Sequence, residues 1–194
     1  MLKHNEKAPI QKLIIRKKLR KIRNSLSFYC QRHAAKRIAL NLARIPSIKR
    51  AKNIGLYYPC DGEISPLLIS KILKNKKFFL PSILDSSTGK MAFARTPSHT
   101  KLRLNYFKIP EPPKHFPKVC SYKMDVILMP LVGFDLNGNR LGMGGGFYDR
   151  ALKHLKKTII KKPITIGVAH YFQQTDAIPQ EAWDITVTRV VTDK

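Results

Sequence analysis

Cysteines, acidic residues and long hydrophobic runs are all scarce in this sequence. Three cysteines, at positions 30, 60 and 120, are widely spaced and odd in number, which excludes a disulfide framework and favours a reducing compartment. The longest apolar run, residues 126–134, is too short to span a membrane. The N-terminal stretch has no apolar segment of the kind found in secretory signals. These absences predict a cytoplasmic protein that has no membrane partner.

The shortage of acidic residues leaves a large positive charge. Lysines and arginines number 37 against 12 aspartates and glutamates, which gives a formal net charge of +25. A field of this sign attracts polyanions such as nucleic acids, nucleotides or anionic lipids. However, residues 1–52, where basic residues are densest, contain only two aromatic residues on which bases could stack, Phe28 and Tyr29. We therefore expect no specific nucleic-acid partner, and we expect much of the excess charge to be solvated surface.

The hydrophobic pattern predicts a single α/β domain covering residues 1–194. Because predicted strands alternate with predicted helices, we expect a mainly parallel sheet with helices on both faces. Four prolines make residues 108–118 an extended surface connection rather than an interior element. The expected helices span 10–24, 28–45, 65–74 and 144–155, and the expected strands span 53–58, 78–83, 90–94, 126–132, 164–169 and 187–192.

Further expectations concern the first two helices. Leu13, Leu19 and Ile22 lie near helical spacing and should form the apolar face of the first helix. Ser27 precedes the second helix and is a good N-cap, because its hydroxyl can accept a hydrogen bond from a free backbone N–H group. We expect residues 1–9, ahead of the first helix, to be flexible.

The segment Pro130–Arg150, PLVGFDLNGNRLGMGGGFYDR, carries the clearest chemical pattern. Its glycines, Gly142 and Gly144–Gly146, follow a predicted central strand and precede a predicted helix. Glycines lack a Cβ atom, so successive N–H groups can converge on one anion. Arg140, ahead of them, can add a charge-assisted contact to a phosphate. The pattern matches neither the GxxxxGK[ST] loop nor the GxGxxG motif cleanly, but it predicts a phosphate-binding loop at the end of a strand.

Two acidic residues are placed to lie beside bound phosphates. Asp149 comes one helical turn beyond the glycines, and Asp184 precedes the last predicted strand. A carboxylate repels phosphates unless a cation intervenes, and Mg²⁺ takes one or two carboxylates together with phosphate oxygens. Asp149 and Asp184 are therefore candidate magnesium ligands. Structural roles stay open for both, since Asp149 can interact with a helix dipole and Asp184 can cap a turn.

These stretches resemble one family, the 5-formyltetrahydrofolate cyclo-ligases or methenyltetrahydrofolate synthetases. The resemblance is collinear over nearly the whole chain, and RLGMGGGFYDR at 140–150 is its most specific part. It implies a single-domain three-layer α/β/α sandwich with a mainly parallel, Rossmann-like sheet of the NagB/RpiA/CoA transferase-like type. The other matching stretches are IGLYYPCDGEI at 54–64, IPEP at 109–112, IGVA at 166–169 and EAWDITVT at 181–188, with Lys12, Arg16 and Arg23–Ser27 ahead of them.

The reaction that the resemblance implies depends on ATP and Mg²⁺. 5-Formyltetrahydrofolate and ATP give 5,10-methenyltetrahydrofolate, ADP and phosphate. The formyl oxygen attacks the γ-phosphate to form an imino-phosphate, N10 closes the ring, and phosphate leaves. Because no covalent protein nucleophile is needed, the enzyme's task is positioning and charge neutralisation. We expect these small molecules as its partners and a monomeric enzyme.

The resemblance assigns residues to the phosphate side of this reaction. Lys12, Arg140 and Tyr148 are the candidate catalytic residues, and Lys12 and Arg16 can share one helix face because they are four residues apart. Gly145 stands where some family members carry a lysine, so Arg140, Lys12 and the metal ion gain importance here. ATP contacts are implied at Lys12, Leu13, Ile14, Ile15, Arg16, Arg140, Leu141, Gly142, Met143, Gly144, Gly145, Gly146, Phe147 and Tyr148.

Folate contacts are implied at Tyr58, Glu63 and Trp183. Glu63 matches the family's substrate-binding acid and can accept hydrogen bonds from pterin N–H groups. Two other readings stay open: a different ATP or sugar-phosphate enzyme on a related α/β fold, and a basic nucleic-acid-binding protein. The first would share the glycine loop without Glu63, and the second would follow from the charge alone.

Overall fold

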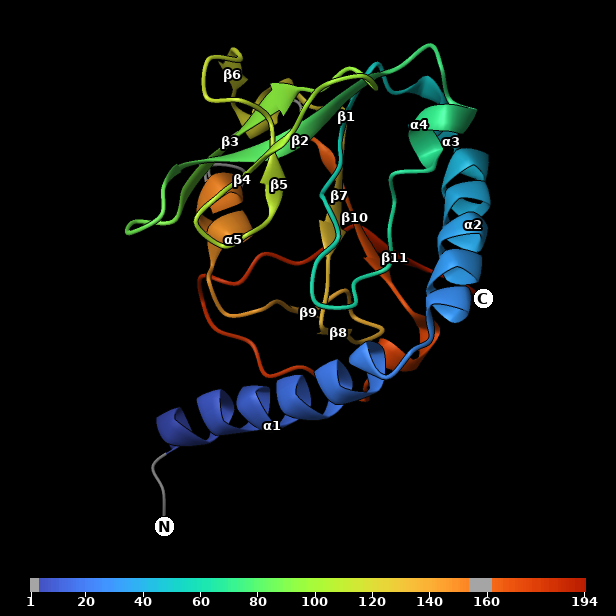
Figure 1. Ribbon diagram of the computed structural model, residues 1–194. Coiled ribbons are helices and arrows are strands. Elements are labelled where there is room, and N and C mark those ends of the chain that lie inside the picture. Colours follow the sequence, from blue (N-terminus) through green and yellow to red (C-terminus); the bar gives the residue numbers. More distant parts are fainter. Residues whose placement is uncertain (1–3, 154–161) are drawn as a thin grey trace.

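A seven-stranded sheet lies at the centre of the computed structural model, which describes residues 4–153 and 162–194 (Figure 1). In chain order its strands are β1 (Asn53–Gly55), β2 (Lys77–Asp85), β3 (Lys90–Arg95), β6 (Lys118–Val119), β7 (Val126–Pro130), β10 (Ile164–Ala169) and β11 (Arg189–Thr192). Across the sheet the order is β11-β10-β7-β1-β2-β3-β6. The pairs that join β11, β10, β7, β1 and β2 are parallel, whereas β3 is antiparallel to β2 and β6. The predicted mainly parallel sheet is confirmed.

Two small hairpins and several helices surround this sheet. The hairpins pair β4 (Arg103–Leu104) with β5 (Pro110–Glu111), and β8 (Gly133–Phe134) with β9 (Arg140–Leu141). The helices are α1 (His4–Asn24), α2 (Phe28–Arg44), α3 (Pro46–Arg50), α4 (Ile69–Ile72) and α5 (Phe147–Leu152), with short 3₁₀ turns η1 (Ser121–Lys123) and η3 (Tyr171–Gln173).

The side chains of β7 show that the sheet is covered on both faces. Alternate residues of a strand point to opposite faces. Val126 and Leu128 pack in a buried cluster with α2, whereas Ile127 and Met129 pack in a second cluster with Leu152 of α5. Burying an aliphatic side chain of this size contributes about 1.5–3 kcal/mol. Helices α2 and α5 thus lie on opposite sides of the sheet (Figure 1), and the predicted three-layer α/β/α arrangement is confirmed.

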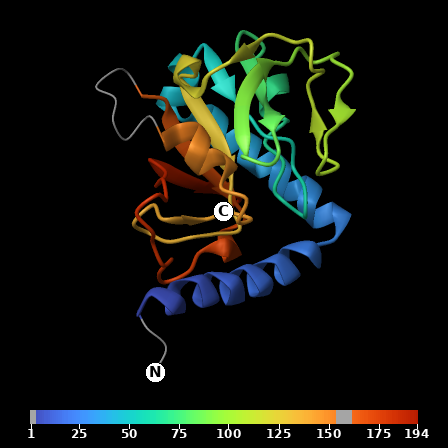
Figure 2. The same cartoon turned by 90° about the vertical axis from the view of Figure 1, so that its left-hand side faces the viewer.

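Helix α1 runs below the sheet, next to the β8–β9 hairpin that follows β7 (Figure 2). Leu19 faces inward and is buried, as predicted. Leu13 and Ile22 are 63% and 38% exposed, so the prediction that they face the core is wrong. The inner face carries the buried cations Lys12 and Arg23 instead, because the loops there present carboxylate and carbonyl oxygens to α1.

The first two helices otherwise follow their predictions. α1 begins at His4 rather than residue 10, so residues 4–9 of the segment expected to be flexible are helical. Residues 1–3 of that segment lie outside the described residues. Ser27 is the N-cap of α2, because its hydroxyl accepts a hydrogen bond from the Cys30 N–H group at 3.2 Å. The predicted cap is confirmed.

Two predicted helices are shorter than expected. The helix predicted over 65–74 is reduced to α4, because the N–H groups of residues 69–71 donate to carbonyl groups three residues earlier, as in a 3₁₀ turn. Apolar side chains of this segment pack against α2. The helix predicted over 144–155 begins only at Phe147, since Gly144 and Gly146 adopt positive φ angles of 103° and 63°. Its predicted last residues, 154 and 155, lie outside the described residues. Among the helices that are described, none is long and apolar enough to cross a membrane.

Two extended segments also differ from expectation. β1 ends at Gly55, three residues before the predicted end, and the chain leaves the sheet as a loop in which the Tyr57 hydroxyl donates to the Ile64 carbonyl. The predicted surface connection over 108–118 is wrong in part, because it contains β5 and the buried Glu111. The Glu111 carboxylate accepts hydrogen bonds from a backbone N–H of β2 and a side-chain amide, which makes its burial tolerable.

Candidate active site

The glycine loop, Gly142–Gly146, joins β9 to α5 on the side of the fold where α1 lies. Gly144 and Gly146 need the left-handed backbone region that only glycine enters freely. No atom lies within 4 Å of the place where a Cβ on Gly142 would sit. Residues 142–145 are exposed, so this stretch offers an open backbone surface. A loop that receives phosphate oxygens needs such an exposed backbone, and the role of this loop toward phosphate stays a prediction.

Two guanidinium groups flank the glycine loop. Nε of Arg16 donates to the Gly142 carbonyl oxygen at 2.8 Å, and Nη2 of Arg150 donates to the Gly145 carbonyl oxygen. Arg150 also lies over the Phe147 ring, 5.6 Å from its centroid. The resemblance predicted Arg16 as a phosphate contact but did not single out Arg150. The signal available for Arg150 was its place at the end of the RLGMGGGFYDR motif.

Lys12 is held between two carboxylates. Its Nζ lies 2.7 Å from Oε2 of Glu181 and 2.7 Å from Oδ2 of Asp184, and the side chain is almost fully buried. Burial lowers the pKa of Lys12, but the hydrogen bonds and charges of Asp184 and Glu181 outweigh burial and raise this pKa above its ordinary value. Lys12 and Arg16 lie on one face of α1, as their spacing predicts. Glu181 is a member of the site that the sequence patterns did not reveal.

The other predicted nucleotide contacts on α1 have different surroundings. Leu13 and Ile14 are more than 60% exposed, and Ile15 packs beside the small cluster around Leu19. Met143 is partly exposed in the glycine loop, and its sulfur accepts a contact from Arg23 at 3.7 Å. Their roles toward ATP remain predictions.

Arg140 and Asp149 form a largely buried ion pair. Nη2 of Arg140 lies 2.6 Å from Oδ1 of Asp149, and the same oxygen accepts the Ile185 N–H group at 3.1 Å. The Arg140 side chain is 6% exposed and the Asp149 side chain 23%. The Ile185 contact brings Asp149 next to the segment that contains Asp184. The structure thus gathers Arg140, Lys12 and the two predicted metal-binding acids around the glycine loop.

A second, buried part of the site contains Glu63 and Tyr148. The Glu63 carboxylate accepts the Cys60 N–H group at 3.1 Å, and burial raises the pKa of Glu63. Burial also raises the pKa of Tyr148, and the charge of Glu63 raises it further while that of Arg140 lowers it. The Tyr148 hydroxyl is buried and has no hydrogen-bond partner among the described residues. Leaving such a group unpaired costs about 1–3 kcal/mol, so a polar ligand atom is favoured beside it.

The aromatic residues expected near the folate are distributed unevenly. Tyr58 is half-buried on the loop that carries Glu63, but Trp183 is 64% exposed on the acidic segment bound by Lys12. An aromatic contact that was not expected joins Phe147 to Phe107 of the β4–β5 hairpin, with ring centroids 5.5 Å apart. Phe107 therefore covers the start of α5, and Trp183 lies in the sequence between the two acids that Lys12 contacts.

The predicted magnesium ligands are chemically suitable. The described residues contain no cluster of three or more side chains that could hold a metal ion. Asp149 and Asp184 each use a single carboxylate oxygen in the hydrogen bonds described, Oδ1 and Oδ2 respectively. Mg²⁺ prefers such hard oxygen ligands and completes its shell with water and phosphate oxygens. Two carboxylates of this kind fit Mg²⁺ together with a nucleotide.

Known proteins are similar to this chain in sequence and in fold. A family model described as the 5-formyltetrahydrofolate cyclo-ligase family matches residues 9–193. A 5-formyltetrahydrofolate cyclo-ligase from Haemophilus influenzae is 37% identical over 174 residues, which cover 88% of this chain and 91% of the relative. One from Escherichia coli strain K12 is 33% identical over 90% of this chain and 96% of the relative. The NMR structure of a 5,10-methenyltetrahydrofolate synthetase from Aquifex aeolicus matches with a TM-score of 0.80 and 34% identity, over 94% of this chain and 90% of that one. The chain therefore belongs to the 5-formyltetrahydrofolate cyclo-ligase family.

Proposed function

We propose that this chain catalyses the ATP-dependent conversion of 5-formyltetrahydrofolate to 5,10-methenyltetrahydrofolate, with release of ADP and phosphate. The names of its relatives support this reaction. The structural observation that carries the proposal is the buried Tyr148 hydroxyl, which has no hydrogen-bond partner among the described residues. Glu63, which is expected to bind the folate, raises the pKa of this hydroxyl, and Arg140, which is expected to bind the transferred phosphate, lowers it.

The proposed chemistry has two steps. The formyl oxygen attacks the γ-phosphorus of ATP, the bond to the β-phosphate oxygen breaks, and ADP leaves. N10 then attacks the formyl carbon, loses its proton, and closes the ring while the formyl oxygen departs within inorganic phosphate. Both steps need close alignment and neutralisation of phosphate charge, and neither needs a protein nucleophile.

The residues of the site divide this work between them. N–H groups of the glycine loop donate to phosphate oxygens, while Lys12 and Arg140 offset the negative charge. Glu63 accepts hydrogen bonds from the pterin ring, and the Tyr148 hydroxyl donates to the folate near the reacting formyl group. Tyr58 borders the pterin, and Trp183 borders the outer part of the site.

Magnesium is part of the proposal. Asp149 and Asp184 would hold the ion, because each is near the glycine loop and each has a carboxylate oxygen outside the described hydrogen bonds. When bound, Mg²⁺ neutralises the charge of the nucleotide phosphates. Ion pairs with Arg140 and Lys12 hold these carboxylates in place, which orients them as ligands. We also propose that the enzyme acts as a monomer in the cytoplasm on these small molecules alone.

The test is to follow the absorbance of the methenyl product while 5-formyltetrahydrofolate, ATP and Mg²⁺ are mixed with the purified protein. We expect a rise that requires both ATP and Mg²⁺. Asp149→Asn should slow it by about 10²–10³-fold, as expected when a group that stabilises transition-state charge is lost. Asp176→Asn, on an exposed aspartate outside the site, is the matched control and should leave the rate unchanged. No product with any combination of substrates would refute the proposal.

A further inference from the structure

A buried arginine near the end of α1 touches both sides of the site. Arg23 is 1% exposed, and its Nε donates to the Asp61 carbonyl oxygen at 2.7 Å. Its Nη1 donates to the Leu131 carbonyl oxygen beyond β7 at 3.1 Å, and Nη2 reaches the Asp61 carboxylate and the Met143 sulfur. One guanidinium group therefore joins the loop that carries Glu63, the end of a central strand and the glycine loop.

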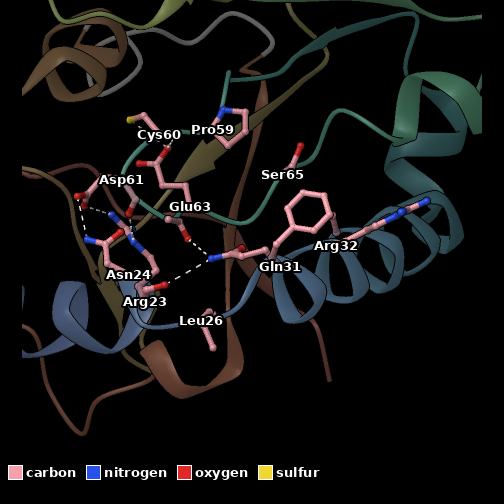
Figure 3. A pocket seen from close by; sticks show the side chains of 13 residues that line it. Arg23, Asn24, Leu26, Gln31, Arg32, Pro59, Cys60, Asp61, Glu63 and Ser65 are labelled. Carbon is pink, nitrogen blue, oxygen red and sulfur yellow. Dashed lines mark hydrogen bonds and ion pairs between the residues drawn. The ribbon is translucent and has the colours of Figure 1, made fainter.

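Asp61 is the centre of the contacts on the Glu63 side (Figure 3). Its carboxylate receives Nε and Nη2 of Arg20 at 2.8 and 3.0 Å, Nη2 of Arg23 at 2.5 Å and the Asn24 amide at 3.0 Å. All of these donors come from the last two turns of α1. Hydrogen bonds from Arg20 contribute most to holding the pKa of Asp61 below its ordinary value. Asp61 is therefore ionised at neutral pH.

The backbone at Asp61 is strained in a way that these contacts offset. Asp61 has a φ angle of +49° and Gly62 one of +71°. A non-glycine residue in this region is disfavoured and persists where its surroundings hold it. The two left-handed residues turn the chain back, so that the Glu63 N–H donates to the Cys60 carbonyl at 2.9 Å and the Glu63 carboxylate meets the Cys60 N–H. The position of Glu63 depends directly on this turn.

A hollow lies beside the turn at Asp61. A cavity of about 500 Å³ lies between residues 59–65 and the start of α2, with Leu26, Phe28 and Arg32 among its lining side chains. Gln31 reaches across it to donate to the Gly62 carbonyl at 2.9 Å (Figure 3). Polar contacts from α1 and α2 therefore hold Asp61 and Gly62 beside this cavity.

We propose that Asp61 is a positioning residue, whose ion pairs with Arg20 and Arg23 hold the turn that places Glu63 and fix the folate side of the site to the helix that carries Lys12 and Arg16. The assignment of folate to Glu63 rests on the proposed function. The contacts of Lys12 and Arg16 with the acidic segment and the glycine loop do not involve Asp61. Loss of the Asp61 charge should therefore weaken folate binding and leave nucleotide binding intact.

Asp61→Asn is the variant that separates these effects. Asparagine keeps the size of the side chain and tolerates a positive φ angle, so the turn can form without the ion pairs. We expect the KM for 5-formyltetrahydrofolate to rise about tenfold, because displacements well below 1 Å in a positioning group are costly. The KM for ATP should stay within about twofold, a change equal to less than 0.5 kcal/mol of binding free energy. Asp61→Gly, which also permits this φ angle, should repeat the split.

The matched control is Asp125→Asn, at the other end of β1. The Asp125 carboxylate accepts the Lys52 and Asn53 N–H groups at 2.9 Å each, so this variant also removes an aspartate that organises backbone. It should lower thermal stability without changing either KM. If Asp61→Asn leaves both KM values unchanged, or raises both to the same extent, Asp61 is not a positioning residue for the folate side.

Amide hydrogen exchange distinguishes this inference from the proposed function. In Asp61→Asn the amides of residues 60–63 should exchange faster than in the wild type, while those of the glycine loop should not. This readout needs no turnover. A wild-type protein that forms no methenyl product refutes the proposed function, and the exchange result still judges the role of Asp61. Unchanged exchange over residues 60–63 would overturn that role whatever the activity.

Discussion

Two sides of the site balance their charges in different ways. The phosphate side contains Lys12, Arg140 and the glycine loop, and the folate side contains Glu63 and its loop. On the phosphate side the two buried cations already have carboxylate partners, since Lys12 lies between Glu181 and Asp184 and Arg140 lies beside Asp149. On the folate side, the described residues give Glu63 a backbone hydrogen bond but no ion pair. The first arrangement holds charged groups in place before an anion arrives. The second leaves a buried acceptor that a ligand's N–H groups must satisfy.

This difference teaches how the two substrates would be received. A nucleotide meets a surface whose cations and acids are already oriented, so little reorganisation is needed when phosphate binds. A pterin ring meets a carboxylate in a low-dielectric setting, where an unmatched ligand leaves polar groups unpaired and is rejected. The phosphate side would supply rate, and the folate side would supply selectivity.

The largest effect is expected from breaking the pre-formed ion pair on the phosphate side with Arg140→Met. The Asp149 carboxylate would then lie in a largely enclosed place without its cation. We expect a loss of about 3 kcal/mol in the free energy of unfolding, as for other buried pairs that lose one partner. We also expect a fall of about 10³-fold in kcat, because the arginine no longer offsets phosphate charge.

Urea unfolding and steady-state kinetics measure the two effects of Arg140→Met. Arg44→Met, on the exposed last turn of α2, removes the same functional group away from the site and should change neither. If Arg140→Met keeps a rate within tenfold of the wild type, the phosphate side does not depend on this pair, and the contrast between the two sides disappears.

The second test sharpens the comparison on the folate side with Glu63→Gln. Glutamine keeps an oxygen for the Cys60 N–H group but loses the charge. We expect kcat/KM for the folate to fall by about 10²-fold, because a neutral amide replaces the carboxylate that is proposed to accept hydrogen bonds from the folate. The affinity for a non-hydrolysable ATP analogue should be unchanged, which provides the internal control. Equal losses for both ligands would place Glu63 outside a separate folate side.

Glu63 also predicts a pH dependence of stability. Burial raises its folded-state pKa above the ordinary value of 4.5, so the folded protein binds this proton more tightly than the unfolded chain does. The resulting stability is complete below the unfolded pKa and is lost as the pH rises through the folded pKa. Glu63→Gln removes this titration. Its unfolding free energy relative to the wild type should therefore increase from about pH 4 toward neutrality, as measured by urea unfolding across that range.

The parts of the fold and site that depend on local pattern were predictable from the sequence. The strand β7 is a continuous apolar run. Gly144 and Gly146, just before α5, adopt left-handed backbone angles that other residues enter only at a cost. Ser27 was recognisable because its hydroxyl precedes an amphipathic helix by one residue. In each of these cases the physical cause lies within a few residues of the effect.

What could not be predicted depends on contacts between distant segments. Lys12 and Arg23 are buried because acids and carbonyl groups from remote loops meet them, and a periodicity argument places every lysine and arginine outside. For the same reason Leu13 was expected inside and is exposed. The ion pairs of Asp61 join residues 38 and 41 positions apart, and a single sequence carries no sign of such pairing. Ion pairs therefore explain why α1 presents its basic face to the site.

The smallest effect is expected where the two sides meet, in Tyr148→Phe. The hydroxyl has no partner among the described residues, so removing it costs no hydrogen bond and relieves the desolvation of a buried polar group. We expect the free energy of unfolding to stay the same or rise by up to about 1 kcal/mol. The turnover rate should nevertheless fall about tenfold, because the hydroxyl would find its partner only in the bound substrate. Tyr29→Phe, at an exposed tyrosine on α2, should leave both quantities unchanged. A Tyr148→Phe protein that loses stability would mean that the hydroxyl has a structural partner, and one that keeps full activity would mean that Glu63 and Arg140 act on separate ligands without a shared group between them.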